Sequence, residues 1–248
     1  MDEAWKYLLL FGVGSFAGFV NVNAGGGSTI TLPTLIFLGL DSALANGTNR
    51  VAILIQNIFA VSSFRKRNVH QFGESMKLSY ATLPGAIIGA LVSVRISDEW
   101  FQRILAVIMI GIVISMFIPR MQKTFENDVS TVKNKWLIYA VMFCLGFYGG
   151  FIQVGVGFLF MAALYHLLKI NLVTVNMHKV FIVLIYTIPS LIIFVSLGYV
   201  NWSFGLSLAA GNALGAWFGA RASVKGGEKL IRIVLAFAII LMAVKLIL

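Results

Sequence analysis

Long apolar runs separated by short polar gaps dominate this 248-residue sequence. Runs long enough for a helix to cross a bilayer, about 20 residues, are found at about 5–23, 43–62, 76–94, 101–119, 136–154, 176–197, 203–220 and 229–248. Only 11% of the residues are charged, against about 25% in soluble domains. So few charges cannot cover a water-facing surface of this size. The sequence therefore predicts an all-α integral membrane protein.

Two shorter apolar stretches, at about 28–40 and 157–169, each directly follow a glycine-rich segment. They are too short for an upright crossing. We therefore expect each stretch to fold back as a hairpin on the helix before it. The glycine-rich segments then become breaks inside the membrane-embedded fold.

Composition also excludes several classes of function. The net charge is +10, but the basic residues gather in the gaps between apolar runs, as in the cytoplasmic loops of membrane proteins, so no nucleic-acid partner is expected. The single cysteine, Cys144, allows no disulfide within the chain and no metal cluster. No HExxH, GxSxG or Walker pattern occurs, and no carboxylate pair lies within the apolar runs. We therefore expect neither an enzyme, nor a metal site, nor a cofactor.

The placement of lysine and arginine orients the predicted helices. Basic residues surround the gaps at about 65–77, 120–135 and 221–232. The positive-inside rule makes these gaps cytoplasmic. The alternate gaps, which include Asp41 and residues 198–201, are then external. With both short stretches folded back as hairpins, the two ends of the chain are external as well.

The chain resembles itself at an offset near 130 residues. Gly18 and Gly26 correspond to Gly149 and Gly157, and the segment 48–50 corresponds to 177–179. Because the charge pattern gives the two halves opposite orientations, we predict two inverted-topology repeats, an architecture common in secondary transporters. Each repeat would be a broken-helix hairpin plus three transmembrane helices. The predicted division is 1–119 for the first half, 120–135 for a cytoplasmic linker and 136–248 for the second half.

The two breaks carry candidate substrate-binding groups. A glycine is disfavoured in a helix by about 1 kcal/mol relative to alanine, and three are consecutive in the first break. A short helix starting at such a break offers free N–H groups and the positive end of its dipole to an anion. A helix kink or tight packing without any ligand is the alternative reading. The candidate residues are Asn21, Asn23, Gly25, Gly26, Gly27, Ser28 and Thr29 in the first break, and Gln153, Gly155 and Gly157 in the second.

Two basic residues fall inside predicted membrane helices at matching repeat positions, Arg50 and Lys179. A lone charge at that depth costs at least a few kcal/mol. With no acidic residue inside the apolar runs, the expected partners are helix C-terminal carbonyls, water or a substrate anion. Snorkelling of the long side chains to the interface is the alternative. The adjacent Thr48, Asn49 and His178 complete the candidate set, with Arg50 expected to contact the anion and His178 expected to be a neutral hydrogen-bonding residue.

The same segments resemble the TauE/SafE family of membrane permeases, also called the sulfite exporter or TSUP family. The motifs that carry the resemblance are Gly14–Gly18, Ala24–Gly27, Leu32–Leu35, Ala45–Asn49, Gly146–Gly150, Gly155–Gly157 and Gly211–Ala216. The resemblance covers nearly the whole chain and implies an integral membrane transporter of sulfur-containing anions, often an exporter of sulfite or a sulfonate. One departure is Ile152-Gln153-Val154, which stands where glycines are often found and makes the two halves unequal.

We therefore expect a secondary transporter, in the role of an exporter, in the inner or plasma membrane. Its partners would be a small anionic substrate, such as sulfite or an organosulfonate, and the lipid bilayer. A channel, or an ion-coupled carrier for another small solute, is the alternative. A coupling proton or Na⁺ and a homodimeric assembly both remain open at this stage.

Overall fold

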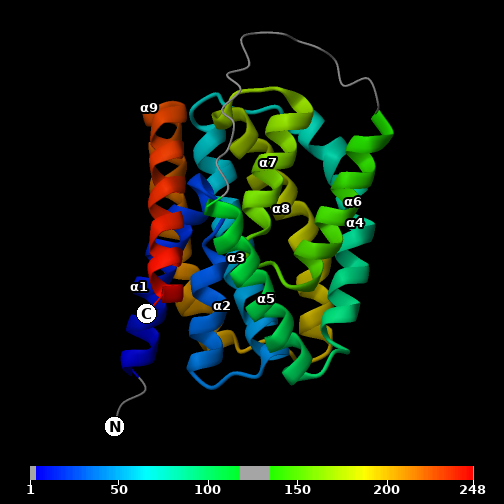
Figure 1. Cartoon of the computed structure of the whole chain (residues 1–248), viewed down its shortest axis with the longest axis vertical. Helices are drawn as coiled ribbons and strands as arrows, with labels where there is room; N and C mark the ends of the chain where they lie inside the picture. The colour runs from blue at the N-terminus through cyan, green and yellow to red at the C-terminus, as the bar shows by residue number, and fades with distance from the viewer. Residues whose placement is uncertain (1–3, 118–134, 248) are drawn as a thin grey trace.

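The computed structural model describes residues 4–117 and 135–247, and all regular structure within them is helical (Figure 1). The helices are α1 (Ala4–Asn23), α2 (Ser28–Phe37), α3 (Ser42–Arg65), α4 (Phe72–Ser93), α5 (Asp98–Phe117), α6 (Lys135–Phe151), α7 (Val156–Leu168), α8 (Leu172–Ser196) and α9 (Trp202–Ile247). The predicted linker, 120–135, lies outside the described residues except for Lys135, the first residue of α6. The two short apolar stretches form α2 and α7, as predicted.

Local chemistry sets where several of these helices begin and end. Asn171 caps α8, because its side-chain oxygen accepts a hydrogen bond from the Thr174 N–H at 2.9 Å. The start of α3 is capped from another helix, since a carboxylate oxygen of Asp98 accepts from the Ser42 N–H at 2.6 Å. Within α9, Gly227 has φ 57° and ψ −153°, which are not helical angles. The chain therefore forms two successive helices there, matching the gap predicted near residues 221–228.

The connections alternate between the two ends of the molecule. In Figure 1 the loops at 38–41, 94–97 and 197–201 lie at the lower end, together with the N-terminal end of α1. The loops at 66–71 and 169–171 lie at the upper end. This grouping agrees with the separation of basic and non-basic gaps in the sequence.

Close packing pairs α1 with α9 and α6 with α4. A Cβ atom added to Gly14 or Gly18 of α1 would clash with backbone atoms of α9, and one added to Gly211 or Gly215 of α9 would clash with α1. Glycines at 85 and 89 of α4, and at 146 and 150 of α6, make the same mutual contact. Small residues of this kind let membrane helices approach through their backbones. The first helix of the chain is therefore held mainly by the part of α9 that precedes Gly227.

The outer surface is strongly apolar. Three helices, α1, α4 and α8, are long and apolar enough to cross a membrane within the described part of the chain. So many exposed large apolar side chains would be exceptional on a soluble protein, whereas lipid accommodates them. Large apolar side chains that are at least half exposed include Trp5, Leu8, Phe37, Trp100, Val107, Trp136, Ile192 and Phe218. The fold is that of a membrane protein.

Candidate functional site

The first break turns the chain back on α1 just after Asn23. Gly25 has φ +90°, a conformation that suits glycine, and it ends the helical path. The Gly27 N–H then donates to the Asn21 side-chain oxygen at 3.2 Å, and Thr29 donates its hydroxyl to the Gly26 carbonyl at 2.6 Å. These bonds fix the start of α2 beside the last turns of α1.

The second break repeats this turn with a different sequence. Gln153 and Gly155 both have positive φ, 62° and 69°. The hydroxyl of Tyr148, in the last turn of α6, donates to the Val154 carbonyl and holds the turn against the helix end. For Gln153, a non-glycine residue, this backbone conformation is strained. Its side-chain contacts with Arg50, described below, account for its fixed position.

The two breaks touch one another through their backbones. A Cβ atom on Gly25 would lie well under 3.0 Å from backbone atoms of Gly157, and the reverse holds for a Cβ atom on Gly157. Both residues are therefore required to be small. This crossing brings the N-terminal ends of α2 and α7 to the same place in the molecule.

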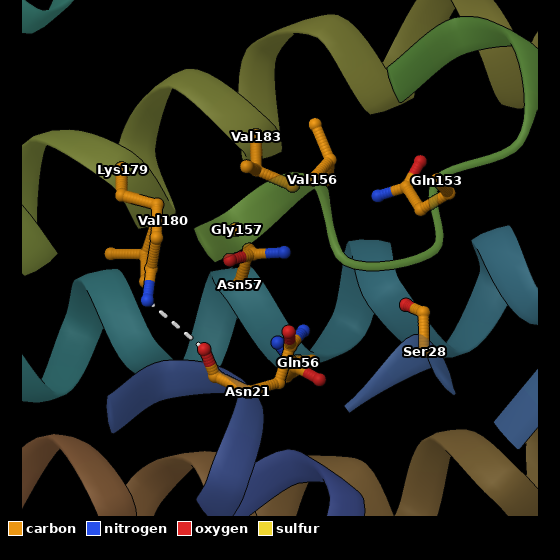
Figure 2. Close-up of a pocket in the computed structure, with 10 residues that line it drawn as sticks. All are labelled: Asn21, Ser28, Gln56, Asn57, Gln153, Val156, Gly157, Lys179, Val180 and Val183. Carbon is orange, nitrogen blue, oxygen red and sulfur yellow. Dashed lines mark hydrogen bonds between the residues drawn. The ribbon is translucent and has the colours of Figure 1, made fainter. Parts of the chain in front are cut away.

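A small pocket lies at this crossing (Figure 2). Ser28 and Gly157 contribute to its wall from the first turns of α2 and α7. One further side is apolar, formed by three valines. Its lining residues are Asn21, Ser28, Gln56, Asn57, Gln153, Val156, Gly157, Lys179, Val180 and Val183. The lining thus combines one cation, several carboxamides, a hydroxyl and an apolar wall.

The ammonium group of Lys179 binds the C-terminal end of α1. Its Nζ donates to the carbonyls of Asn21 at 3.0 Å and Val22 at 2.7 Å, and to the Asn176 side-chain oxygen at 3.0 Å. Figure 2 shows the side chain reaching down from α8 toward Asn21. Its three acceptors are neutral oxygens, and two of them carry the negative end of the α1 dipole.

Arg50 makes the equivalent contact at the C-terminal end of α6. Its guanidinium donates to the carbonyls of Gly149, at 3.3 Å, and Gly150, and to Oε1 of Gln153 at 3.1 Å. The Phe194 ring covers it, 4.8 Å from the guanidinium carbon to the ring centroid. Gly149 and Gly150 stand 128 positions after Asn21 and Val22. Each cation therefore comes from one half of the chain and binds the broken helix of the other half.

Comparison with known proteins identifies the family. Residues 10–246 match the family described as Sulfite exporter TauE/SafE. The chain is a TauE/SafE family member. The TauE/SafE relatives include the Probable membrane transporter protein YfcA of Escherichia coli (strain K12), 30% identical over 96% of this chain and 88% of that protein.

Two further TauE/SafE relatives are similar over more than nine tenths of their length. The Probable membrane transporter protein ORF9 of a Sinorhizobium species is 27% identical over 99% of this chain and 94% of its own. A Probable membrane transporter protein of Haemophilus influenzae is 26% identical, over 96% and 93% of the two chains. No solved structure matches the chain.

The structure of this TauE/SafE protein places the predicted site residues partly in the pocket wall and partly outside it. Those that line the pocket are Asn21, Ser28, Gln153, Gly157 and Lys179. The other predicted break residues form the turns of the breaks without lining the pocket. They are Gly25, Gly26, Gly27, Thr29 and Gly155.

Four predicted residues tie helices together outside the pocket. Asn23 donates to the Gly219 carbonyl of α9 at 3.2 Å, and the Thr48 hydroxyl accepts from the Asn201 N–H at 2.9 Å. Asn49 accepts from Thr31 at 2.8 Å, and His178 Nδ1 lies 2.8 Å from the Ser75 hydroxyl. Arg50 lies behind Gln153 rather than in the pocket wall. In this arrangement Lys179 is the cation nearest the cavity.

Five lining residues were absent from the predicted set: Gln56, Asn57, Val156, Val180 and Val183. The two carboxamides had a detectable signal in the sequence. Asn57 follows Arg50 by seven positions and Gln56 follows Asn49 by seven, so each pair shares one face of α3. Polar side chains in an otherwise apolar stretch indicate a buried polar face, and in the structure Gln56 and Asn57 of this face line the pocket, whereas Asn49 and Arg50 do not. The valines carried no such signal.

Proposed function

We propose that this protein is a secondary transporter that exports a small sulfur-containing anion, such as sulfite or an organosulfonate, through a bacterial inner or plasma membrane. The observation that carries the proposal is the pocket at the crossing of the two breaks. Helix N-terminal ends face that pocket, and a buried lysine lines it. Family membership supports membrane transport as the general activity.

The balance of helix dipoles favours an anion. The negative C-terminal ends of α1 and α6 are each neutralised by a buried cation, Lys179 and Arg50. The positive N-terminal ends of α2 and α7 border the pocket through Ser28 and Gly157. A site with its negative ends neutralised and its positive ends facing the cavity attracts negative charge.

The lining also suits an oxyanion with a small organic part. Asn21, Gln56, Asn57 and Gln153 each carry a carboxamide, whose NH₂ group can donate to anionic oxygens. Val156, Val180 and Val183 offer a surface for the carbon atoms of a sulfonate. Few polar groups placed on an apolar wall are typical of small-molecule sites.

Matching contacts in the two halves support a mechanism of alternating access between inverted repeats. Asn46 donates to Ser93 at 2.9 Å, and Asn176 donates to Ser223 at 3.4 Å, each partner standing 130 positions after its counterpart. Together with the exchanged cations, these pairs support two equivalent halves with the site between them. Rocking one half against the other would open the site to each side in turn.

Counterflow in proteoliposomes tests this function. Purified protein is reconstituted with sulfite or a short sulfonate inside, and entry of the labelled compound from outside is followed against sulfate, chloride and empty liposomes. We expect saturable uptake that depends on internal sulfite or sulfonate. Flux that stays linear with concentration and ignores the internal compound would indicate a channel. Saturable counterflow of an unrelated solute alone would contradict the substrate class.

A further inference from the structure

The ammonium of Lys179 has three N–H donors, and the structure gives it three acceptors. The distances are 3.0 Å to Asn21 O, 2.7 Å to Val22 O and 3.0 Å to Asn176 Oδ1. Lys179 is 2% exposed. The group is thus a buried cation held by two helix C-terminal carbonyls and one carboxamide oxygen.

Such a cluster of oxygens is what a bound inorganic cation would use. In transporters with broken helices, unwound carbonyls and the C-terminal ends of half-helices coordinate the coupling Na⁺. Oxygen donors of this type suit hard cations generally. Here the same kind of position is filled by a side chain that cannot leave.

The second break shows the same arrangement independently. The carbonyls of Gly149 and Gly150 and the side-chain oxygen of Gln153 surround the guanidinium of Arg50. Two backbone carbonyls and one carboxamide oxygen thus serve each cation. The same set of acceptors, two helix-end carbonyls and one carboxamide oxygen, thus occurs at both breaks, although the two sets are formed by different residues far apart in sequence.

We propose that Lys179 and Arg50 are tethered cations that permanently occupy the two carbonyl sites at the helix breaks. Transport of the anion then requires no inorganic cation bound there. This role in transport rests on the proposed function, whereas the occupancy of the carbonyl sites does not. Removing the Lys179 side chain should convert its position into a site for a small free cation.

Thermal unfolding of the purified protein in detergent tests the proposal without any transport assay. Each variant is compared in NaCl, methylammonium chloride and N-methyl-D-glucamine chloride at equal ionic strength. Lys179→Ala leaves space for a cation, Lys179→Met fills the space with an apolar chain, and Lys179→Arg keeps a tethered charge. We expect Lys179→Ala to unfold at a lower temperature and to regain about 2–4 °C or more, saturably, with Na⁺ or methylammonium. Lys179→Met should lose stability without recovery, and the wild type should not distinguish the three salts.

Saturable stabilisation of the wild type by Na⁺ would overturn the proposal, and this measurement does not depend on any variant folding. Equal stability of Lys179→Ala and wild type, or an absence of rescue in Lys179→Ala, would also overturn it. Anion flux in proteoliposomes separates this inference from the proposed function. Sulfite flux that requires Na⁺ contradicts the tethered-cation assignment alone. Rescue of Lys179→Ala in a protein that moves no sulfite or sulfonate contradicts the substrate class alone.

Discussion

The guanidinium of Arg50 donates to the Oε1 atom of Gln153, 3.1 Å away, and so joins α3 to the second helix break. Gln153 lines the pocket, and Arg50 does not. We therefore expect the cation to act on the pocket through the orientation of this carboxamide. A lysine at position 50 keeps the charge but lacks the planar guanidinium, whose two NH₂ groups reach Gly150 on one side and Gly149 and Gln153 on the other.

Arg50→Lys should accordingly weaken anion binding. Without its bond to Arg50, Gln153 should lose its own hydrogen bond to the anion, and losing a hydrogen bond to a charged group costs about 1.5–3 kcal/mol, or about ten- to a hundredfold in affinity. Titration of purified protein with sulfite and a sulfonate measures it. Arg103→Lys is the matched control, since Arg103 is exposed on α5 and pairs with Glu99. Wild-type affinity in Arg50→Lys would mean that Arg50 only satisfies the carbonyls at the C-terminal end of α6 and does not affect anion binding.

Gly157→Ala should destabilise the protein strongly. The new Cβ would meet the backbone of Gly25, which no side-chain rotation can relieve. Overpacking of a tight contact costs about 1–3 kcal/mol. Gly12→Ala is the control, because a Cβ there has no neighbour within 4 Å, and alanine is favoured in a helix by about 1 kcal/mol. The melting temperature in detergent should fall for Gly157→Ala and stay the same or rise for Gly12→Ala. An equal change in both variants would contradict the backbone contact between Gly157 and Gly25.

Val183→Ala should shift selectivity toward bulkier sulfonates. Val183 forms part of the apolar wall of the pocket, and its truncation adds room for carbon atoms. One buried methylene contributes about 0.8 kcal/mol, so a sulfonate longer by one carbon should gain about fourfold relative to sulfite. Competition assays with a sulfonate series measure the ratio. Val195→Ala, on the exposed side of the same helix, should leave the ratio unchanged. An equal change in both variants would contradict the contact between Val183 and the substrate.

Acid should abolish the stabilisation that Asp98 gives to α3. Asp98 lies at the exposed start of α5, before the predicted span, and hydrogen bonds from Ser42 lower the pKa of its carboxyl. A lowered pKa in the folded state means that the contribution is present above the unfolded value of about 3.9 and is lost as the pH falls through the folded value. Asp98→Ala should therefore melt below wild type at pH 7, with the gap closing below about pH 4.

Asp41→Ala is the control for this pH experiment. Asp41 precedes α3 directly, yet its side chain makes no capping hydrogen bond. Its removal should change the melting temperature less than the removal of Asp98. A gap between Asp98→Ala and wild type that persists undiminished at pH 3 would show that the carboxylate charge plays no part.

Orientation in the membrane can be read with single cysteines in a Cys144→Ser background. Gln71, just before α4, and Ser196, the last residue of α8, are exposed, and the loops beside them lie at opposite ends of the molecule (Figure 1). The positive-inside rule makes Gln71→Cys cytoplasmic and Ser196→Cys external. An impermeant maleimide added to intact cells should label only the second. The reverse pattern would invert the assignment of export and import faces.

Sequence reasoning located the elements because lipid imposes strong local constraints. Three glycines in a row are costly inside a helix, so the position of the first break and the start of α2 at Ser28 were predictable. Helix ends were less regular. The first turn of α4 begins at Phe72, ahead of the predicted 76, because its polar residues extend the helix past the apolar run.

The partners of the buried cations were only partly predictable. Because the sequence has no carboxylate near Arg50 or Lys179, the expected partners were carbonyls, water or substrate. In the structure both cations bind carbonyls. Which helix end each cation meets depends on contacts between residues about 100 to 158 positions apart. No local pattern encodes that pairing. The expected contact of Arg50 with the anion remains a prediction.

The glycine contact between α1 and α9 has a consequence for biosynthesis. Gly18 packs on the backbone of Asn212, nearly the whole chain away. When a ribosome has delivered only the first half, α1 lacks the surface on which it finally rests. Closing such a distant contact late is slow relative to local pairing. The nascent first helix therefore has to be retained in the bilayer, by lipid or by the insertion machinery, until the first part of α9 emerges and packs against it.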